Sequence, residues 1–105
     1  NGVNLSLTER NDGVSGHAII QVDNHGQNCI LLYGGTNQAL TEDYIDRALE
    51  AFGNEGLVLV QNETNLVGTI MQKARDRGLK VAINASPMDE KILTYLCSRM
   101  YLYSC

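Results

Sequence analysis

The alternation of apolar and polar positions is most informative in the second half of the chain. Residues 57–61 read Leu-Val-Leu-Val-Gln, and the polar residues Asn62 and Glu63 follow at once. A short and nearly uniform apolar run of this kind is typical of a strand in a parallel sheet. We therefore expect a strand over 57–61 that is buried on both faces.

Apolar residues recur at helical spacing both before and after this strand, which predicts a helix on each side of it in the sequence. The first such segment, 41–52, begins at the good N-cap Thr41 and ends before a glycine. The second, 64–77, is expected to begin at Thr64 or Asn65 and to stop at a glycine.

The pattern then repeats toward the C-terminus. A second short apolar strand is predicted over 79–84, a third helix opens within 86–90, and 100–103 is predicted to be a third strand. Right-handed crossovers would make these strands parallel, so Glu63 and Asn84 should emerge at the same edge of the sheet. Ligands of open α/β sheets bind beyond the carboxyl ends of the strands, which makes Glu63 a candidate site residue.

The first half of the chain predicts antiparallel structure. Two strand-like runs, 17–23 and 28–33, are separated by a glycine-containing break, which indicates a β-hairpin. Both runs carry apolar residues on both faces, so we expect one face to pack on the body and the other to meet a ligand or another chain. A two-residue turn and a bulged three-residue turn would place different residues opposite Ala18. Residues 1–16 are polar, and weak alternation over 3–7 predicts an edge strand followed by a loop.

Composition limits the possible functions. The 105 residues suffice for one modest domain, and the net charge of −4 argues against nucleic acid or an anionic membrane as a partner. No apolar run approaches the roughly 18 residues that span a bilayer. The three cysteines show no zinc or disulfide spacing, which favours a reducing cytoplasm. The chain opens on Asn1 rather than Met, so we expect it to be cut from a longer protein.

Known catalytic motifs are missing from the sequence. It contains neither GxxxxGK[ST] nor GxGxxG, and His17 and His25 lack a Ser or Cys partner at a recognisable spacing. Glu63 taken alone has two interpretations: a ligand-binding carboxylate, or a charge that the dipole of the following helix stabilises. Asn84 could similarly be only a turn former.

Several short motifs, taken in series, resemble the ribokinase-like sugar kinases, also called the phosphofructokinase-B family. The resemblance runs from about Gly2 to Leu93 and rests on the segments 15–20, 23–28, 35–40, 61–63 and 84–87. It implies a Rossmann-like three-layer α/β/α fold with parallel strands and an antiparallel β-hairpin that belongs to a lid. Residues 1–37 would hold the edge strand and the lid hairpin, and 38–105 would be part of the α/β core.

The resemblance also implies a function. These kinases transfer the γ-phosphoryl group of ATP to a sugar hydroxyl, most closely here the primary hydroxyl of D-ribose. Glu63 falls on the family's sugar-binding glutamate, and Ala18 and Ile30 fall near the apolar sugar contacts of the lid. ATP with magnesium and a potassium ion are implied as cofactors, with no ligands for them identifiable in this chain. Lid pairing with a second subunit implies a homodimer.

The sequence departs from the family in ways that matter for activity. The family's Gly-Gly-Lys-x-x-Asn, Asn-x-x-Glu and Gly-Ala-Gly-Asp segments are absent, together with the catalytic base and the ATP loops. We assign no catalytic residue and expect the chain alone to be inactive. Residues 96–105 follow the family poorly, which suggests a frameshift, an alternative end or an artefact. The rival hypothesis is a non-catalytic α/β binding or dimerisation module, and the sugar itself stays open among ribose, deoxyribose, fructose, ketodeoxygluconate and nucleosides.

Overall fold

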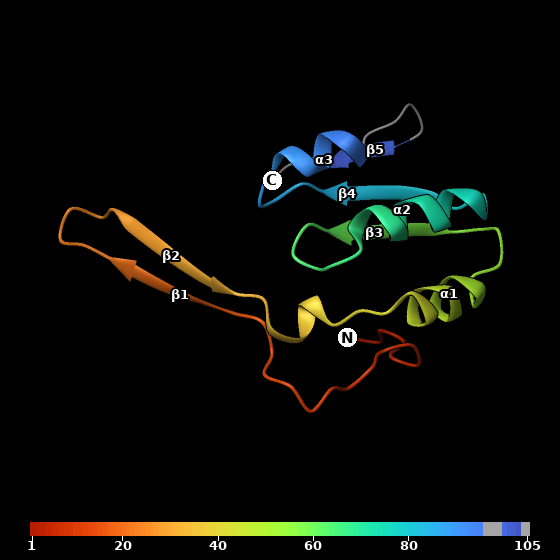
Figure 1. Ribbon diagram of the computed structural model, residues 1–105, viewed down its shortest axis with the longest axis horizontal. Helices are drawn as coiled ribbons and strands as arrows, with labels where there is room; N and C mark the ends of the chain where they lie inside the picture. Colours follow the sequence, from red (N-terminus) through yellow and green to blue (C-terminus); the bar gives the residue numbers. More distant parts are fainter. Residues whose placement is uncertain (96–99, 104–105) are drawn as a thin grey trace.

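The chain folds into an α/β unit from which a β-hairpin projects (Figure 1). The computed structural model describes residues 1–95 in full and the secondary structure of 100–103. In chain order the elements are β1 (His17–Val22), β2 (Asn28–Tyr33), the 3-10 helix η1 (Gly35–Gln38), α1 (Glu42–Glu50), β3 (Leu57–Gln61), α2 (Val67–Asp76), β4 (Lys80–Asn84), α3 (Glu90–Tyr95) and β5 (Met100–Tyr103).

Three parallel strands form the sheet of the α/β unit, as the sequence predicts. Their order is β3-β4-β5, with Leu57 opposite Lys80 and Gln61 opposite Asn84. The carboxyl ends of the strands therefore lie at one edge, where the loop after β3 carries Glu63. The α/β class, the parallel strands and the antiparallel hairpin expected from the sequence are all present.

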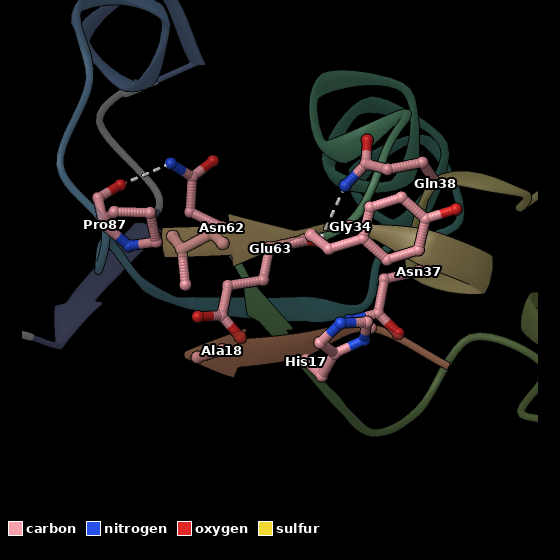
Figure 2. A pocket seen from close by; sticks show the side chains of 11 residues that line it. His17, Ala18, Gly34, Asn37, Gln38, Asn62, Glu63 and Pro87 are labelled. Atoms are coloured by element: carbon pink, nitrogen blue, oxygen red, sulfur yellow. Dashed lines mark hydrogen bonds between the residues drawn. The ribbon is translucent and has the colours of Figure 1, made fainter. Parts of the chain in front are cut away.

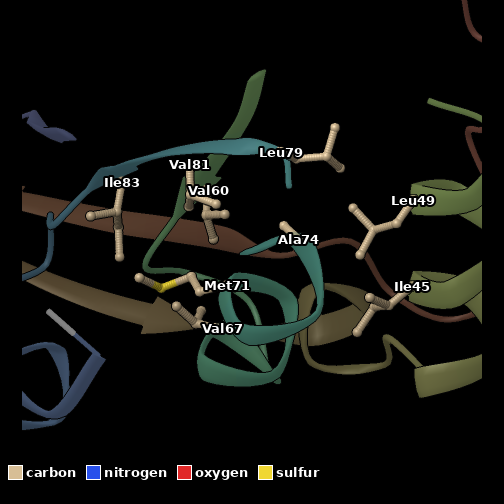
Figure 3. Packing of buried hydrophobic residues seen from close by; sticks show 9 residues of the cluster. All are labelled: Ile45, Leu49, Val60, Val67, Met71, Ala74, Leu79, Val81 and Ile83. Atoms are coloured by element: carbon tan, nitrogen blue, oxygen red, sulfur yellow. The ribbon is translucent and has the colours of Figure 1, made fainter. Parts of the chain in front are cut away.

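Helix α2 covers one face of this sheet and forms the core (Figure 3). Met71 and Ala74 of α2 pack against Val81 and Ile83 of β4, and all four are fully buried. Val60 of β3, Val67 of α2, Leu79 and two residues of α1, Ile45 and Leu49, complete the cluster.

Helix α1 has a side-chain N-cap, and ion pairs join it to α2. The Oγ1 atom of Thr41 accepts a hydrogen bond from the backbone N of Tyr44 at 3.2 Å, which confirms the predicted N-cap. The Nζ atom of Lys73 in α2 lies 2.6 Å from Asp46 Oδ2 and 3.2 Å from Glu42 Oε2, both in α1. The hydrogen bond to Asp46, together with the hydrogen bond to Glu42 and the charges of both carboxylates, raises the pKa of Lys73 above its usual value.

Strand β3 is buried on one face only, so the expectation of burial on both faces is wrong. Leu57 and Leu59 are each 62% exposed, whereas Val60 on the other face is buried. The crossovers β3-α2-β4 and β4-α3-β5 run in the same direction across the sheet. Tyr95 of α3 accordingly packs against the same cluster as α2, and the described residues leave the second face of β3 open.

The hairpin turn is the bulged three-residue form. The backbone N of Asp23 donates to Gln27 O at 2.9 Å, and Gly26 has the left-handed φ of 79° that such a turn requires. The carboxylate of Asp23 accepts hydrogen bonds from the backbone N of His25 and of Gln27, which stabilises the loop. The resulting register places Ala18 opposite Leu32, and Ile20 opposite Ile30.

Neither face of the hairpin packs on the body, so the prediction that one face would do so is wrong. Every residue of β1 and β2 is exposed; Ile20 on one face is 60% exposed and Leu31 on the other 55%. The reason is geometric: the hairpin points away from the sheet and meets the body only at its base (Figure 1).

The predicted edge strand over 3–7 does not form. Local hydrogen bonds replace strand pairing: Asn4 Oδ1 accepts from Ser6 N, and Leu5 O accepts from Thr8 N. Further on, the arm crosses α1, where Tyr44 Oη donates to Leu7 O at 2.7 Å and Arg47 pairs with Glu9 at 2.8 Å.

The remaining sequence expectations concern the C-terminus and the membrane. The predicted strand at 100–103 is present as β5, whereas 96–99 and 104–105, and with them Cys97 and Cys105, lie outside the described residues. Cys29, on β2, is exposed and has a free thiol. Within the described part of the chain, no helix has the length and apolar character needed to span a bilayer.

The two-faced apolar hairpin predicts self-association. Exposed contiguous apolar surface on a sheet edge favours pairing with another chain. We expect light scattering to show that the chain forms species larger than a monomer. The double variant Ile20→Thr/Ile30→Thr replaces one cross-strand pair with a polar pair that strands tolerate, and it should shift the chain toward the monomer. Val3→Thr, at an exposed apolar residue outside the hairpin, is the matched control and should change nothing. A monodisperse wild-type monomer would contradict this expectation.

Candidate functional site

A pocket lies between the base of the hairpin and the carboxyl edge of β3 (Figure 2). Its volume of about 540 Å³ is in the range of small-molecule sites, about 300–1,000 Å³. The walls come from three segments: the ends of β1 and β2 nearest the body, the η1 turn, and the loop that follows β3. A short stretch at Pro87, after β4, closes one side.

Among the described residues that line the pocket, Glu63 is the one with an acidic side chain. It follows β3 by two residues, and Figure 2 shows its carboxylate extending toward Ala18. Helix α2 begins only at Val67 and has no acidic residue in its first turn. The helix-dipole interpretation of Glu63 therefore lacks the geometry that it needs, since that stabilisation falls off beyond the first turn.

The late start of α2 corrects the predicted helix boundary. Neither Thr64 nor Asn65 is the N-cap; Leu66 occupies that position with a left-handed φ of 57° and ψ of 23°. A non-glycine residue in this region is uncommon and costs about 1–2 kcal/mol. The loop 62–66 is thus kept out of the helix, and Glu63 with it.

Side-chain amides surround Glu63, and sequence reasoning gave them no role. Asn37, Gln38 and Asn62 all line the pocket. Gln38 Nε2 donates to the backbone O of Glu63 at 2.8 Å, and Asn62 Nδ2 donates to Pro87 O at 2.6 Å (Figure 2). The signal for Asn62 was available, because it directly follows β3 at the edge where ligands bind. Gln38 could not be found this way, since only the fold brings it to a residue 25 positions later.

Asn84 lies at the same sheet edge but does not line the pocket. Its backbone O accepts a hydrogen bond from Asn62 N at 3.3 Å, and its Oδ1 accepts one from Ser86 N at 3.3 Å. The side chain therefore shapes the turn after β4. The expected proximity to the Glu63 loop is present, and the turn-forming interpretation describes the side chain.

The first two cross-strand pairs of the hairpin, His17 with Tyr33 and Ala18 with Leu32, line the pocket. Ala18 lines the pocket together with Leu32, which stands directly opposite it. Ile30 lies two pairs farther out, on the same face of the hairpin as Leu32, and does not line the pocket. The structure therefore brings Glu63 and Ala18 together and places Leu32, rather than Ile30, beside them.

His17 lies at the rim of the pocket, where its ring contacts the backbone of Ser15 and the ring of Tyr33. Its Nδ1 lies 3.0 Å from Ser15 O, so this nitrogen carries the proton, and its ring centroid is 5.2 Å from that of Tyr33. This arrangement is structural, in line with the sequence-based interpretation. His25 lies in the hairpin turn, at the end of the hairpin opposite the base that lines the pocket.

The pocket suits a neutral polar molecule better than a nucleotide. None of its described lining residues is a Lys or Arg, and within the same described part of the chain no three His, Cys, Asp or Glu side chains gather closely enough to hold a metal ion. Triphosphate binding relies on cationic side chains, metal ions or glycine-rich loops. The described residues therefore do not fit ATP or its magnesium ion.

Comparison with known proteins identifies the kind of protein to which this pocket is related. The chain is 33% identical over 92 residues to the bifunctional ribokinase/ribose-5-phosphate isomerase A of Fructilactobacillus sanfranciscensis, covering 85% of the chain and 17% of that protein. It is 32% identical over 95 residues to a ribokinase of Arabidopsis thaliana, covering 87% of the chain and 25% of the relative. No protein-family model matches the chain.

The fold comparison agrees with the sequence comparison. The crystal structure of ribokinase from Thermotoga maritima matches with a TM-score of 0.58 and 30% identity, over 85% of this chain and 29% of that one. The chain thus spans a quarter or less of the curated relatives described above. In sequence and in fold, the chain is similar to part of a ribokinase, and its fold is of the α/β class.

Proposed function

We propose that this chain is the sugar-binding part of an ATP-dependent carbohydrate kinase that phosphorylates the primary hydroxyl of D-ribose. The observation that carries the proposal is the position of Glu63, which stands free of α2 in a pocket shared by the sheet edge and the hairpin. The names of the relatives favour ribose over the other sugars.

The chemistry of the pocket supports a polyol ligand. A carboxylate accepts short, charge-assisted hydrogen bonds from hydroxyl groups, which are stronger than those between neutral groups. The amides of Asn37, Gln38 and Asn62 offer further polar groups, and Ala18 and Leu32 offer an apolar wall for the carbon face of a sugar. A few polar groups set in an otherwise apolar wall are typical of small-molecule sites.

In this proposal the machinery for phosphoryl transfer lies outside these 105 residues. The catalytic base, the anion hole and the sites for ATP, magnesium and potassium would belong to other segments of a complete kinase. In support, the described residues include no group of three His, Cys, Asp or Glu side chains that could hold a metal ion, and no described Lys or Arg lines the pocket. Transfer depends on positioning and charge stabilisation, which half a site cannot provide.

The hairpin supports a second element of the proposal, a homodimer. Both of its faces are apolar and exposed, so one face could close over the sugar while the other meets the hairpin of a second copy. The same observation favours the alternative function, a non-catalytic binding or dimerisation module. The two functions differ in whether Glu63 contacts a ligand.

The first test replaces the proposed ligand contact. Glu63→Ala should weaken D-ribose binding by about 1–3 kcal/mol, because sugar hydroxyls lose a charged acceptor. Glu55→Ala removes the same charge at an exposed position outside the pocket and should leave the affinity unchanged. Isothermal titration calorimetry compares the three chains. Equal affinity for wild type and Glu63→Ala would contradict the role of Glu63 and favour the alternative module.

The second test concerns catalysis. The 105-residue chain should show no ATP-dependent phosphorylation of D-ribose above a blank without protein, because in this proposal the sites for ATP and its metal lie in other segments of a complete kinase. The described residues offer no group of three His, Cys, Asp or Glu side chains for the metal. Transfer of the labelled γ-phosphoryl group of ATP to ribose is the measurement. Turnover above the blank would place a complete catalytic site within this chain and overturn the division of labour proposed above.

A further inference from the structure

The segment that joins the hairpin to α1 is hydrogen-bonded to the loop that carries Glu63. Gln38 Nε2 donates to Glu63 O at 2.8 Å, and the backbone N of Asn65 donates to Asn37 O at 3.3 Å. Residues 37–40 and 63–65 are 25 positions apart in the chain, so this contact exists only in the folded state.

The side chain of Asn65 makes the most specific part of this connection. Its Oδ1 accepts from Leu40 N at 3.0 Å, and its Nδ2 donates to Leu40 O at 2.8 Å. The backbone N–H and C=O of Leu40 are thus both hydrogen-bonded to the side-chain amide of Asn65. This two-point contact fixes orientation as well as distance, and it is partly buried, where an unmade hydrogen bond costs more.

The backbone next to Asn65 shows what the contact achieves. The sequence predicts Asn65 as an N-cap of α2, but its side chain bonds to Leu40 instead, and the helix begins only at Val67. Leu66 between them adopts the left-handed region, a conformation that persists only where surrounding contacts impose it. The contact between Asn65 and Leu40 is directly next to Leu66 in the chain, at the point where the loop that carries Glu63 meets the helix.

The same segment is fixed to the hairpin on its other side. Thr36 N donates to Val14 O at 3.0 Å, just ahead of β1. Gly35 has a left-handed φ of 52° and lies so close to the backbone of Val14 that a Cβ atom at this position would collide with it. The base of the hairpin, residues 35–40 and the Glu63 loop therefore form one connected path of hydrogen bonds and close packing.

We propose that Asn65 is a positioning residue, which holds Glu63 in its ligand-binding orientation by bonding to Leu40 and couples that orientation to the base of the hairpin. The part that concerns sugar affinity rests on the proposed function. The part that concerns the loop does not, and the two are tested separately.

The loop is tested without any ligand. Hydrogen exchange by mass spectrometry, read at the segments 37–41 and 62–66, compares wild type with Asn65→Ala, Asn65→Asp and the control Asn54→Ala, an asparagine in an exposed turn. Losing both bonds should speed exchange in both segments by about tenfold in Asn65→Ala. Asn65→Asp keeps the acceptor for Leu40 N and should fall between wild type and Asn65→Ala. Exchange in Asn65→Ala equal to that in wild type overturns the proposal.

The link to Glu63 is tested with D-ribose as the probe. Asn65→Ala should weaken ribose binding about tenfold, and it should add nothing in the double variant Glu63→Ala/Asn65→Ala, because Asn65 acts through Glu63. A general loss of stability would weaken both backgrounds alike. Additive losses in the double variant therefore overturn the positioning role.

Two results separate this proposal from the proposed function. If the wild-type chain does not bind ribose, the proposed function fails, and the exchange rates alone decide whether Asn65 holds the loop. If Asn65→Ala does not fold, Asn65→Asp replaces it: this variant keeps the acceptor for Leu40 N, loses the donor to Leu40 O and should still speed exchange at 62–66. Unchanged exchange there overturns the proposal.

Discussion

The packing of α2 on one face of the parallel sheet is the constraint on which the rest of the structure depends. Met71 and Ala74 are fully buried against Val81 and Ile83, and the burial of such apolar side chains is the main favourable term in folding. This contact holds β3 and β4 in a parallel register with Gln61 beside Asn84. It thereby determines where the strands end, and hence where the loop bearing Glu63 leaves the sheet.

The pocket depends on a second, polar constraint. Packing brings the sheet edge to the right place, but the orientation of the loop is determined by hydrogen bonds from Gln38 and Asn65 across 25 positions of sequence. Apolar contacts tolerate small shifts, whereas a two-point amide contact does not. The apolar core thus provides stability, and the side-chain amides fix the geometry that a ligand would contact.

The sequence predicts the regular elements well because their signals are local. Thr41 caps α1 as expected, the hairpin forms over nearly the predicted runs, and the parallel order from β3 to β5 follows from alternating strand and helix patterns. The expectation that β3 is buried on both faces was wrong because burial depends on tertiary structure. The open face at Leu57 and Leu59 depends on which side both crossovers take, and an apolar run cannot show that.

The site was predictable only in part for the same reason. Glu63 could be singled out because it follows a buried strand, and Ala18 because of the family resemblance. Leu32 and Ile30 could not be told apart before the register of the hairpin was known, since a bulged turn moves the pairing. Asn65 read as a helix cap because its local context is that of a cap, and its contact with Leu40 exists only in three dimensions.

The central claim is that the pocket between the hairpin base and the β3 edge holds a sugar. The most direct measurement is a D-ribose titration followed by nitrogen-15 NMR, which reports on each backbone amide. If the pocket binds ribose, chemical shifts should change at Ala18, Gln38, Asn62 and Glu63, and none should change along α1. Saturable changes elsewhere, or no changes at ribose concentrations that saturate known sugar sites, would contradict it.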